Sequence, residues 1–178
     1  MRSYIIQNLN AKLPLEYPKI SIIVSIMMAF VVIIALGFEH IGGYIPCALC
    51  LEQRIAYYMG APLMVIAGMA SYFTAPTFLV RGLVFIAGIL MIYNAVLGFY
   101  HSGVEWYWWP GPESCGAAAD GLSLNAADLL SDINNKIPPS CDKAALRVFG
   151  LSFAGWNVIA SSILAFFTLR FAMRKISN

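Results

Sequence analysis

The stretch ISIIVSIMMAFVVIIALGF, from Ile20 to Phe38, contains no charged side chain over nineteen positions. A helix needs about 20 apolar residues to cross a hydrocarbon core about 30 Å thick, so this stretch is long enough to span a membrane. Three further uncharged runs follow along the chain: Ile55–Val80, Gly82–Tyr100 and Val148–Leu169. They are apolar all round rather than alternating, which favours helices over strands. The sequence therefore predicts four transmembrane helices.

The composition of the 178 residues supports this prediction, because 60% are hydrophobic and only 11% are charged. A soluble domain is about half apolar and about a quarter charged. Eleven basic residues against nine acidic ones give a net charge of +2, which excludes a surface for binding nucleic acid. We predict an all-α membrane protein, a four-transmembrane-helix bundle forming a single domain over residues 1–178, with spans at about 20–38, 51–73, 79–100 and 149–169.

Lysine and arginine residues beside the spans predict the orientation of the chain. Those of the two tails and of the second connection fall on one side of a four-span topology, the expected cytoplasmic side: Arg2, Lys12, Lys19, Arg81, Arg170, Arg174 and Lys175. Connection 39–50 has no lysine or arginine, and connection 101–148 has three basic residues against six acidic ones. Both connections are therefore expected outside. The first apolar run is longer than that of a signal peptide, so we expect it to be retained.

The long outer connection is expected to carry a short amphipathic helix. Apolar residues recur at helical spacing between Leu122 and Ile137, and two prolines end the pattern before Cys141. Such a helix would lie along the membrane surface with its apolar side inward.

All four cysteines lie in the two outer loops. Four cysteines allow three pairings, and adjacency in the chain favours Cys47–Cys50 and Cys115–Cys141. A Cys-x-x-Cys is the recurring arrangement of redox-active thiols, whose pKa is lowered by helix ends and nearby cations. Arg54 follows Cys50 by four residues, on the same helical face, where its charge can stabilise a thiolate.

Other interpretations fit parts of this pattern. Arg54 can simply extend to the interface at the beginning of a helix, and His101 can be an interfacial hydrogen-bonding residue. Asn94 is expected to tie neighbouring helices together. The Cys-x-x-Cys can be half of a zinc site completed by Cys115, Cys141 or His101, although zinc sites usually show a second closely spaced pair. The chain can also be a structural or metal-binding tetraspan protein whose outer loops are braced by disulfides.

Two cysteine pairs outside a four-helix membrane protein suggest a relay of thiol–disulfide exchange. The pair in the long loop would meet a soluble thiol partner, and the Cys-x-x-Cys would receive the electrons next. A two-electron acceptor in the lipid must complete the relay. The sequence has no haem-attachment motif, dinucleotide fingerprint or phosphate loop, so a quinone is inferred by elimination.

The segment Pro46-Cys47-Ala48-Leu49-Cys50, followed by Gln53-Arg54, resembles the signature of the disulfide bond formation protein B (DsbB) family of thiol–quinone oxidoreductases. The resemblance extends through nearly the whole chain and includes Trp108-Trp109-Pro110-Gly111-Pro112 before Cys115. It implies a protein of the bacterial inner membrane, with its cysteine loops in the periplasm. A vitamin-K-epoxide-reductase-like enzyme is chemically related, but its Cys-x-x-Cys is expected near a later helix.

The resemblance also implies a role for each cysteine. Cys115 and Cys141 are expected to form the disulfide that oxidises a DsbA-type periplasmic thiol oxidase, with Cys115 forming the mixed disulfide. Cys47 and Cys50 are expected to form a second disulfide that reoxidises the loop pair.

The remaining implied roles concern the quinone, which is ubiquinone or menaquinone. Cys50 is expected to be the thiolate that faces it. Arg54 is expected to stabilise this thiolate and the developing quinol oxyanion, and His101 to line the quinone pocket. The resemblance implies no metal.

Overall fold

The computed structural model describes residues 16–113, 115 and 140–174 of the chain. In these residues it has four long helices: α2 (Glu16–His40), α3 (Ala48–Tyr72), α4 (Thr77–Glu105) and α7 (Phe153–Met173). All four are long and apolar enough to cross a membrane, which confirms the predicted four-helix membrane fold. The amphipathic helix expected between Leu122 and Ile137 lies outside the described residues.

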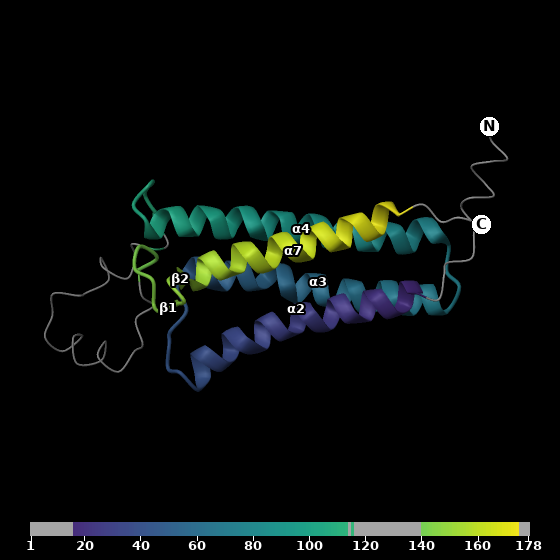
Figure 1. Cartoon of the computed structure of the whole chain (residues 1–178), viewed down its shortest axis with the longest axis horizontal. Coiled ribbons are helices and arrows are strands. Elements are labelled where there is room, and N and C mark those ends of the chain that lie inside the picture. The colour runs from purple at the N-terminus through teal and green to yellow at the C-terminus, as the bar shows by residue number, and fades with distance from the viewer. Residues whose placement is uncertain (1–15, 114, 116–139, 175–178) are drawn as a thin grey trace, which may run out of the picture.

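The helices lie side by side along the long axis of the molecule (Figure 1). α4 packs against both α3 and α7, whereas α2 packs mainly against α3 and makes few contacts with α7. Methionines fill the centre of the bundle, where Met28, Met64 and Met91 are fully buried. Outward-facing side chains are apolar as well, and Ile26 and Phe30 are each at least 60% exposed. Helices that are apolar on all sides suit a bundle surrounded by lipid.

Local signals in the sequence set where the helices begin. The Cys47 sulfur caps α3 by accepting the backbone N–H of Cys50 at 3.3 Å. Pro76, whose φ is −53°, precedes α4. The Ser152 hydroxyl caps α7 by accepting the N–H of Gly155 at 3.2 Å.

The end of α4 and the beginning of α7 differ from the predicted spans. α4 continues past Tyr100 to Glu105, which places His101 in its last turns. α7 begins only at Phe153, because the preceding residues form an antiparallel hairpin of β1 (Arg147–Val148) and β2 (Leu151–Ser152). Phe149 and Gly150 make its two-residue turn with φ values of 52° and 84°, the backbone that such turns require.

The two ends of the bundle differ in their contacts. At one end, Arg174 pairs with Glu16 at 3.2 Å and Arg81 donates to the Ala172 carbonyl at 2.7 Å, so that α7 is held to α2 and α4. The other end carries the four cysteines, which gather at the start of α3 and beside the end of α4. The cytoplasmic location of the first end stays a prediction.

Trp109 fastens the segment that leads from α4 to Cys115. Its indole N–H donates to the Tyr100 carbonyl at 2.8 Å, and its ring stacks on that of Tyr100 at 5.9 Å. The same indole lies directly over Gly103, so closely that a Cβ at this position would overlap the ring. The absence of a side chain at position 103 therefore allows Trp109 to fold back against the helix.

We expect Gly103→Ala to displace Trp109 and to destabilise the protein by about 1–3 kcal/mol, the usual cost of overpacking. Thermal unfolding in detergent measures the effect. Gly82→Ala is the matched control in the same helix, because nothing lies within 4 Å of its Cβ position. Equal losses of stability in the two variants would show that the contact with Trp109 is unimportant.

Candidate active site

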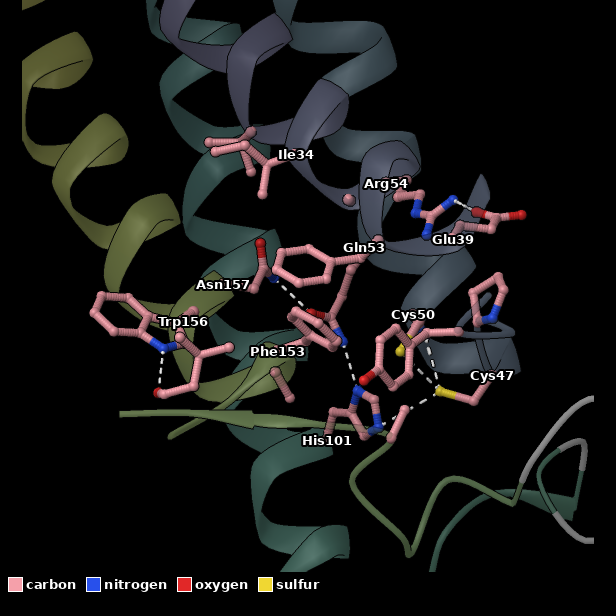
Figure 2. A pocket seen from close by; sticks show the side chains of 18 of the residues that line it. Ile34, Glu39, Cys47, Cys50, Gln53, Arg54, His101, Phe153, Trp156 and Asn157 are labelled. Carbon is pink, nitrogen blue, oxygen red and sulfur yellow. Dashed lines mark hydrogen bonds and ion pairs between the residues drawn. The ribbon is translucent and has the colours of Figure 1, made fainter. Parts of the chain in front are cut away.

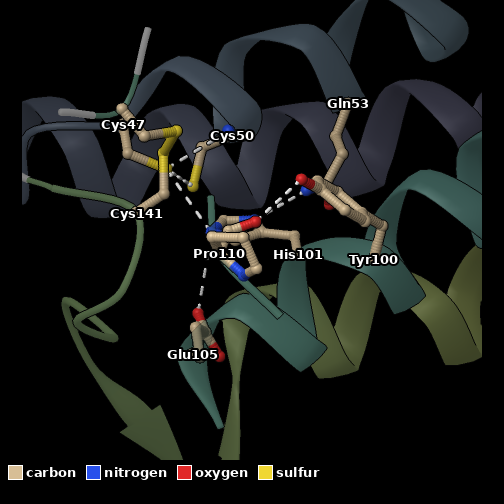
Figure 3. The surroundings of a disulfide bond; sticks show 9 residues. Cys47, Cys50, Gln53, Tyr100, His101, Glu105, Pro110 and Cys141 are labelled. Carbon is tan, nitrogen blue, oxygen red and sulfur yellow. Dashed lines mark hydrogen bonds and ion pairs between the residues drawn. A yellow bond between two sulfur atoms is a disulfide. The ribbon is translucent and has the colours of Figure 1, made fainter. Parts of the chain in front are cut away.

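The four cysteines form one cluster at one end of the bundle (Figure 3). Cys47, Cys115 and Cys141 are buried together with Val104 of α4, and Cys50 packs against them. Residues far apart in the sequence are thus brought into one apolar site.

Cys115 and Cys141 are joined by a disulfide. Cys141 is 1% exposed and Cys115 is 7% exposed, so this bond lies against the protein rather than in solvent. Cys47 and Cys50 are free thiols whose sulfurs are 2.9 Å apart, which is within one S–H···S hydrogen bond. The structure therefore combines an oxidised loop pair with a reduced Cys-x-x-Cys pair.

The Cys47 sulfur is the focus of the polar contacts around the reduced pair. Besides the Cys50 thiol, it is contacted by the backbone N–H of Cys50 and by Nε2 of His101, 3.6 Å away. The hydrogen bond with the Cys50 thiol is the largest effect on the pKa of Cys47, which is lowered well below the ordinary thiol value. Burial raises this pKa, but the contacts with His101 lower it further. These contacts favour the thiolate form of Cys47.

His101 lies between the thiols and the interior of the bundle. Its Nε2 faces Cys47 and is 3.8 Å from the Glu105 carboxylate one helical turn later, while its Nδ1 is 2.8 Å from the side-chain nitrogen of Gln53. The ring is only 2% exposed. His101 therefore bridges the reduced cysteine and the polar groups of α3.

Arg54 lies at the edge of the same site, but its polar partner in the described part of the chain is Glu39. The two side chains form an ion pair between the first turns of α3 and the end of α2 (Figure 2). Both are partly exposed, at 13% and 28%. The stabilisation of a Cys50 thiolate by Arg54 stays a prediction.

A cavity of about 370 Å³ opens beside Cys50, between α2 and the beginnings of α3 and α7 (Figure 2). Its walls are mainly aliphatic and aromatic, with polar groups gathered at the end near the cysteines. Its lining includes Ile34, Phe38, Cys50, Arg54, His101 and Phe153. An apolar pocket with a few convergent polar groups is typical of a small-molecule site.

The cavity fits the planar, apolar ring of a quinone. Phe38 and Phe153 lie 4.9 Å apart between ring centres and form one wall, while the Arg54 guanidinium and the His101 ring are hydrogen-bonding groups at the polar end. Ile34 on the wall is 45% exposed, so the cavity borders the surface that faces lipid. The donors and the apolar walls match a ligand with two carbonyl oxygens that dissolves in the membrane.

The same cysteines and His101 also define the candidate metal site. The ligand atoms of Cys47, Cys50 and His101 lie within 4.8 Å of one another. No fourth His, Cys or carboxylate completes this group among the described residues, and Cys115 and Cys141 are bound to each other. A closed structural zinc site needs four ligands. The set is therefore incomplete for the zinc interpretation.

Several residues of the site were missed by the sequence analysis. Glu105 is buried beside His101, and the spacing of four residues would have revealed the pair if the helix had been extended beyond Tyr100. In the sequence, Glu39 marks only the end of the first apolar run. Gln53 was noted as part of the motif without a role, and Asn157, which bonds to it, lies inside the last apolar run.

A Cys-x-x-Cys pair beside a disulfide, at one end of a four-helix membrane bundle, defines a membrane thiol–disulfide protein. The chain belongs to the DsbB family, because the family model described as "Disulfide bond formation protein DsbB" matches residues 18–171. It is therefore a membrane oxidoreductase of disulfide-bond formation. Comparisons with curated proteins and with solved structures give no match.

We expect the thiolate absorbance of the reduced protein to persist on acidification to at least about two units below the ordinary thiol pKa of about 8.5. The contacts around Cys47 stabilise its anion, so the charge is lost only at low pH. Ultraviolet titration measures the midpoint, and Cys47→Ser should abolish the low-pH transition. A midpoint in the ordinary thiol range would contradict this assignment of the charge.

Proposed function

We propose that this protein transfers two electrons at a time from a soluble dithiol to a membrane quinone. One observation carries the proposal: the Cys47–Cys50 pair packs against the Cys115–Cys141 disulfide on one side and lines the apolar cavity on the other. The pair is thus in contact with both the proposed donor and the proposed acceptor site.

The first transfer is a thiol–disulfide exchange with the soluble partner. A thiolate of the partner attacks Cys115, which forms the mixed disulfide, and Cys141 leaves as a thiolate. The second thiol of the partner then displaces Cys115. The partner ends as a disulfide, and Cys115 and Cys141 end as a dithiol that holds the two electrons. The proposed partner is a DsbA-type periplasmic thiol oxidase.

The second transfer moves the electrons to the Cys-x-x-Cys. Cys115 and Cys141 reduce a Cys47–Cys50 disulfide by the same exchange and become a disulfide again. In the mixed disulfide that contains Cys47, Cys50 leaves as a thiolate, next to the cavity.

When bound, the quinone supplies a two-electron, two-proton acceptor, so that dithiol and quinone become disulfide and quinol. Arg54 would hold one carbonyl oxygen at the mouth of the cavity, and His101 would donate near the cysteines. The apolar walls exclude water from this part of the site. Ubiquinone or menaquinone has the required ring.

The proposed location is the bacterial inner membrane, with both chain ends in the cytoplasm and the cysteine loops in the periplasm. Arg81 and Arg174 at the end of the bundle away from the cysteines support this orientation, since basic residues favour the cytoplasmic side. A periplasmic location also allows the disulfides to persist.

The direct test combines the purified protein with a reduced DsbA-type protein and a soluble ubiquinone or menaquinone analogue. We expect stoichiometric formation of quinol and oxidised partner, and complete loss of turnover in Cys47→Ser and Cys50→Ser, because each removes a sulfur of the relay. Quinol absorbance and thiol counting are the measurements. No turnover with either quinone would refute the proposal and favour the structural tetraspan protein.

The order of the cysteines is tested by mixing loop-cysteine variants with the oxidised partner, whose disulfide is attacked by a free loop thiolate to give a mixed disulfide and a released partner thiolate. Cys141→Ser should accumulate a mixed disulfide between Cys115 and the partner, visible on non-reducing gels. Cys115→Ser is the matched variant and should not trap the partner. Equal trapping by both would show that Cys115 is not the partner-facing residue.

We expect Arg54→Gln to raise the KM for the quinone about 10- to 100-fold while exchange with the partner continues, because it removes a charge-assisted hydrogen bond. Steady-state kinetics at varied quinone concentration measure this effect. Glu39→Gln breaks the same ion pair but keeps the cation, so its KM should stay within about threefold of wild type, less than the loss of a typical hydrogen bond. An equal rise in both variants would mean that Arg54 acts by joining α2 to α3.

A further inference from the structure

A chain of hydrogen bonds runs from the interior of the bundle to the reduced Cys47. The Asn157 side-chain N–H of α7 donates to the Gln53 carbonyl oxygen at 2.6 Å. The Gln53 side-chain nitrogen lies 2.8 Å from Nδ1 of His101, and Nε2 of His101 lies 3.6 Å from the Cys47 sulfur (Figure 2). Gln53 and His101 are 5% and 2% exposed, so the chain of hydrogen bonds is buried inside the bundle.

At the inner end of this chain of hydrogen bonds, the contacts of Asn157 indicate which groups donate and which accept. The carbonyl oxygen of Asn157 accepts from the Tyr57 hydroxyl at 2.8 Å, from the Ser161 hydroxyl at 3.2 Å and from the Asn94 N–H at 3.2 Å. In this arrangement the amide nitrogen of Asn157 faces Gln53. An amide has one accepting and one donating end, so Gln53 accepts from Asn157 and donates to His101.

This direction determines the tautomer of His101. A neutral imidazole carries one N–H, and an Nδ1 that accepts from Gln53 leaves the proton on Nε2. We propose that Gln53, oriented by Asn157, is a positioning residue that holds His101 in the Nε2–H tautomer and so directs an N–H donor at the Cys47 sulfur, where it stabilises a thiolate. Its importance for turnover rests on the function proposed above.

The other charged groups around Cys47 do not provide this donor. In the described part of the chain, the titratable groups that interact with Cys47 are Cys50 of α3 and His101 and Glu105 of α4. Glu105 is an acceptor and competes with Cys47 for the Nε2 proton from 3.8 Å. Lys143 and the Arg54–Glu39 ion pair line the cavity without a hydrogen bond to Cys47. The N–H of His101 is therefore the side-chain donor from α4 to this sulfur.

The tautomer is observable because the chain has only two histidines. His40 is exposed at the end of α2, away from the reduced pair, and His40→Gln leaves a single imidazole. In this background, ¹⁵N-histidine labelling of the reduced protein reports which ring nitrogen carries the proton. We expect Nε2 to be protonated and Nδ1 to be bare.

Gln53→Glu is the first test variant, because its side chain has nearly the same shape but its carboxylate can only accept. We expect Nδ1 of His101 to become protonated, a reversal that a purely structural role of Gln53 would not produce. A protonated Nδ1 in the protein with native Gln53 would mean that the amide chain runs in the opposite direction, and it would overturn the proposal.

Gln53→Met is the second variant, and it removes the donor to Nδ1 while keeping the length of the side chain. We expect the midpoint of the Cys47 thiolate titration to rise by about one unit, a tenfold loss of thiolate at low pH, as for a hydrogen bond to a charged group. Glu52→Met is the matched control, one residue earlier in α3 and exposed, and should leave the midpoint unchanged. An unchanged midpoint in Gln53→Met would refute the proposed role.

Both readouts use the reduced protein without quinone or partner. The proposed function is measured separately, by quinol formation in the wild type. If the wild type reduces quinone but the tautomer and the midpoint do not respond to Gln53, this inference fails alone. If they respond and no quinone is reduced, the proposed function fails and the role of Gln53 stands.

Discussion

The hydrogen bond from the Cys50 backbone N–H to the Cys47 sulfur is the contact on which the site depends. It caps the first turn of α3, so the reactive sulfur and the beginning of a transmembrane helix are placed by the same contact. Three residues of separation bring the second sulfur to 2.9 Å from the first. A thiolate accepts such an N–H better than a thiol, so the helix end also favours the charged form.

Polar groups inside the bundle must form hydrogen bonds with one another, because the lipid hydrocarbon has no hydrogen-bonding groups. Tyr57, Asn94, Asn157 and Ser161 form one hydrogen-bonded group, which confirms the expectation that Asn94 ties helices together. This group joins α3, α4 and α7 at one level of the membrane and continues through Gln53 to His101. The packing of the helices and the orientation of the imidazole are therefore set by one network.

The sequence predicts a structural feature best where one continuous run of residues is enough to indicate it. Uncharged runs predict the four helices, and the Cys-x-x-Cys predicts the reactive pair. The beginning of α7 could not be read in this way, since a hairpin turn with positive φ at Phe149 and Gly150 interrupts an apolar run that otherwise resembles helix. The ion-pair partner of Arg54 could not be predicted from the sequence either. Glu39 belongs to a different helix, and only the fold brings the two side chains together.

The bundle separates the two sides of the reactive pair. α4 packs closely against α3 and α7, whereas α2 makes few contacts with α7, and the cavity lies where these two helices do not close on each other. The cavity therefore approaches the pair from the side of α2. The loop disulfide lies against Val104 at the end of α4, outside the apolar run that ends at Tyr100. Cys47 and Cys50 are common to the disulfide cluster and the cavity wall, so this one pair of residues joins the two parts of the site.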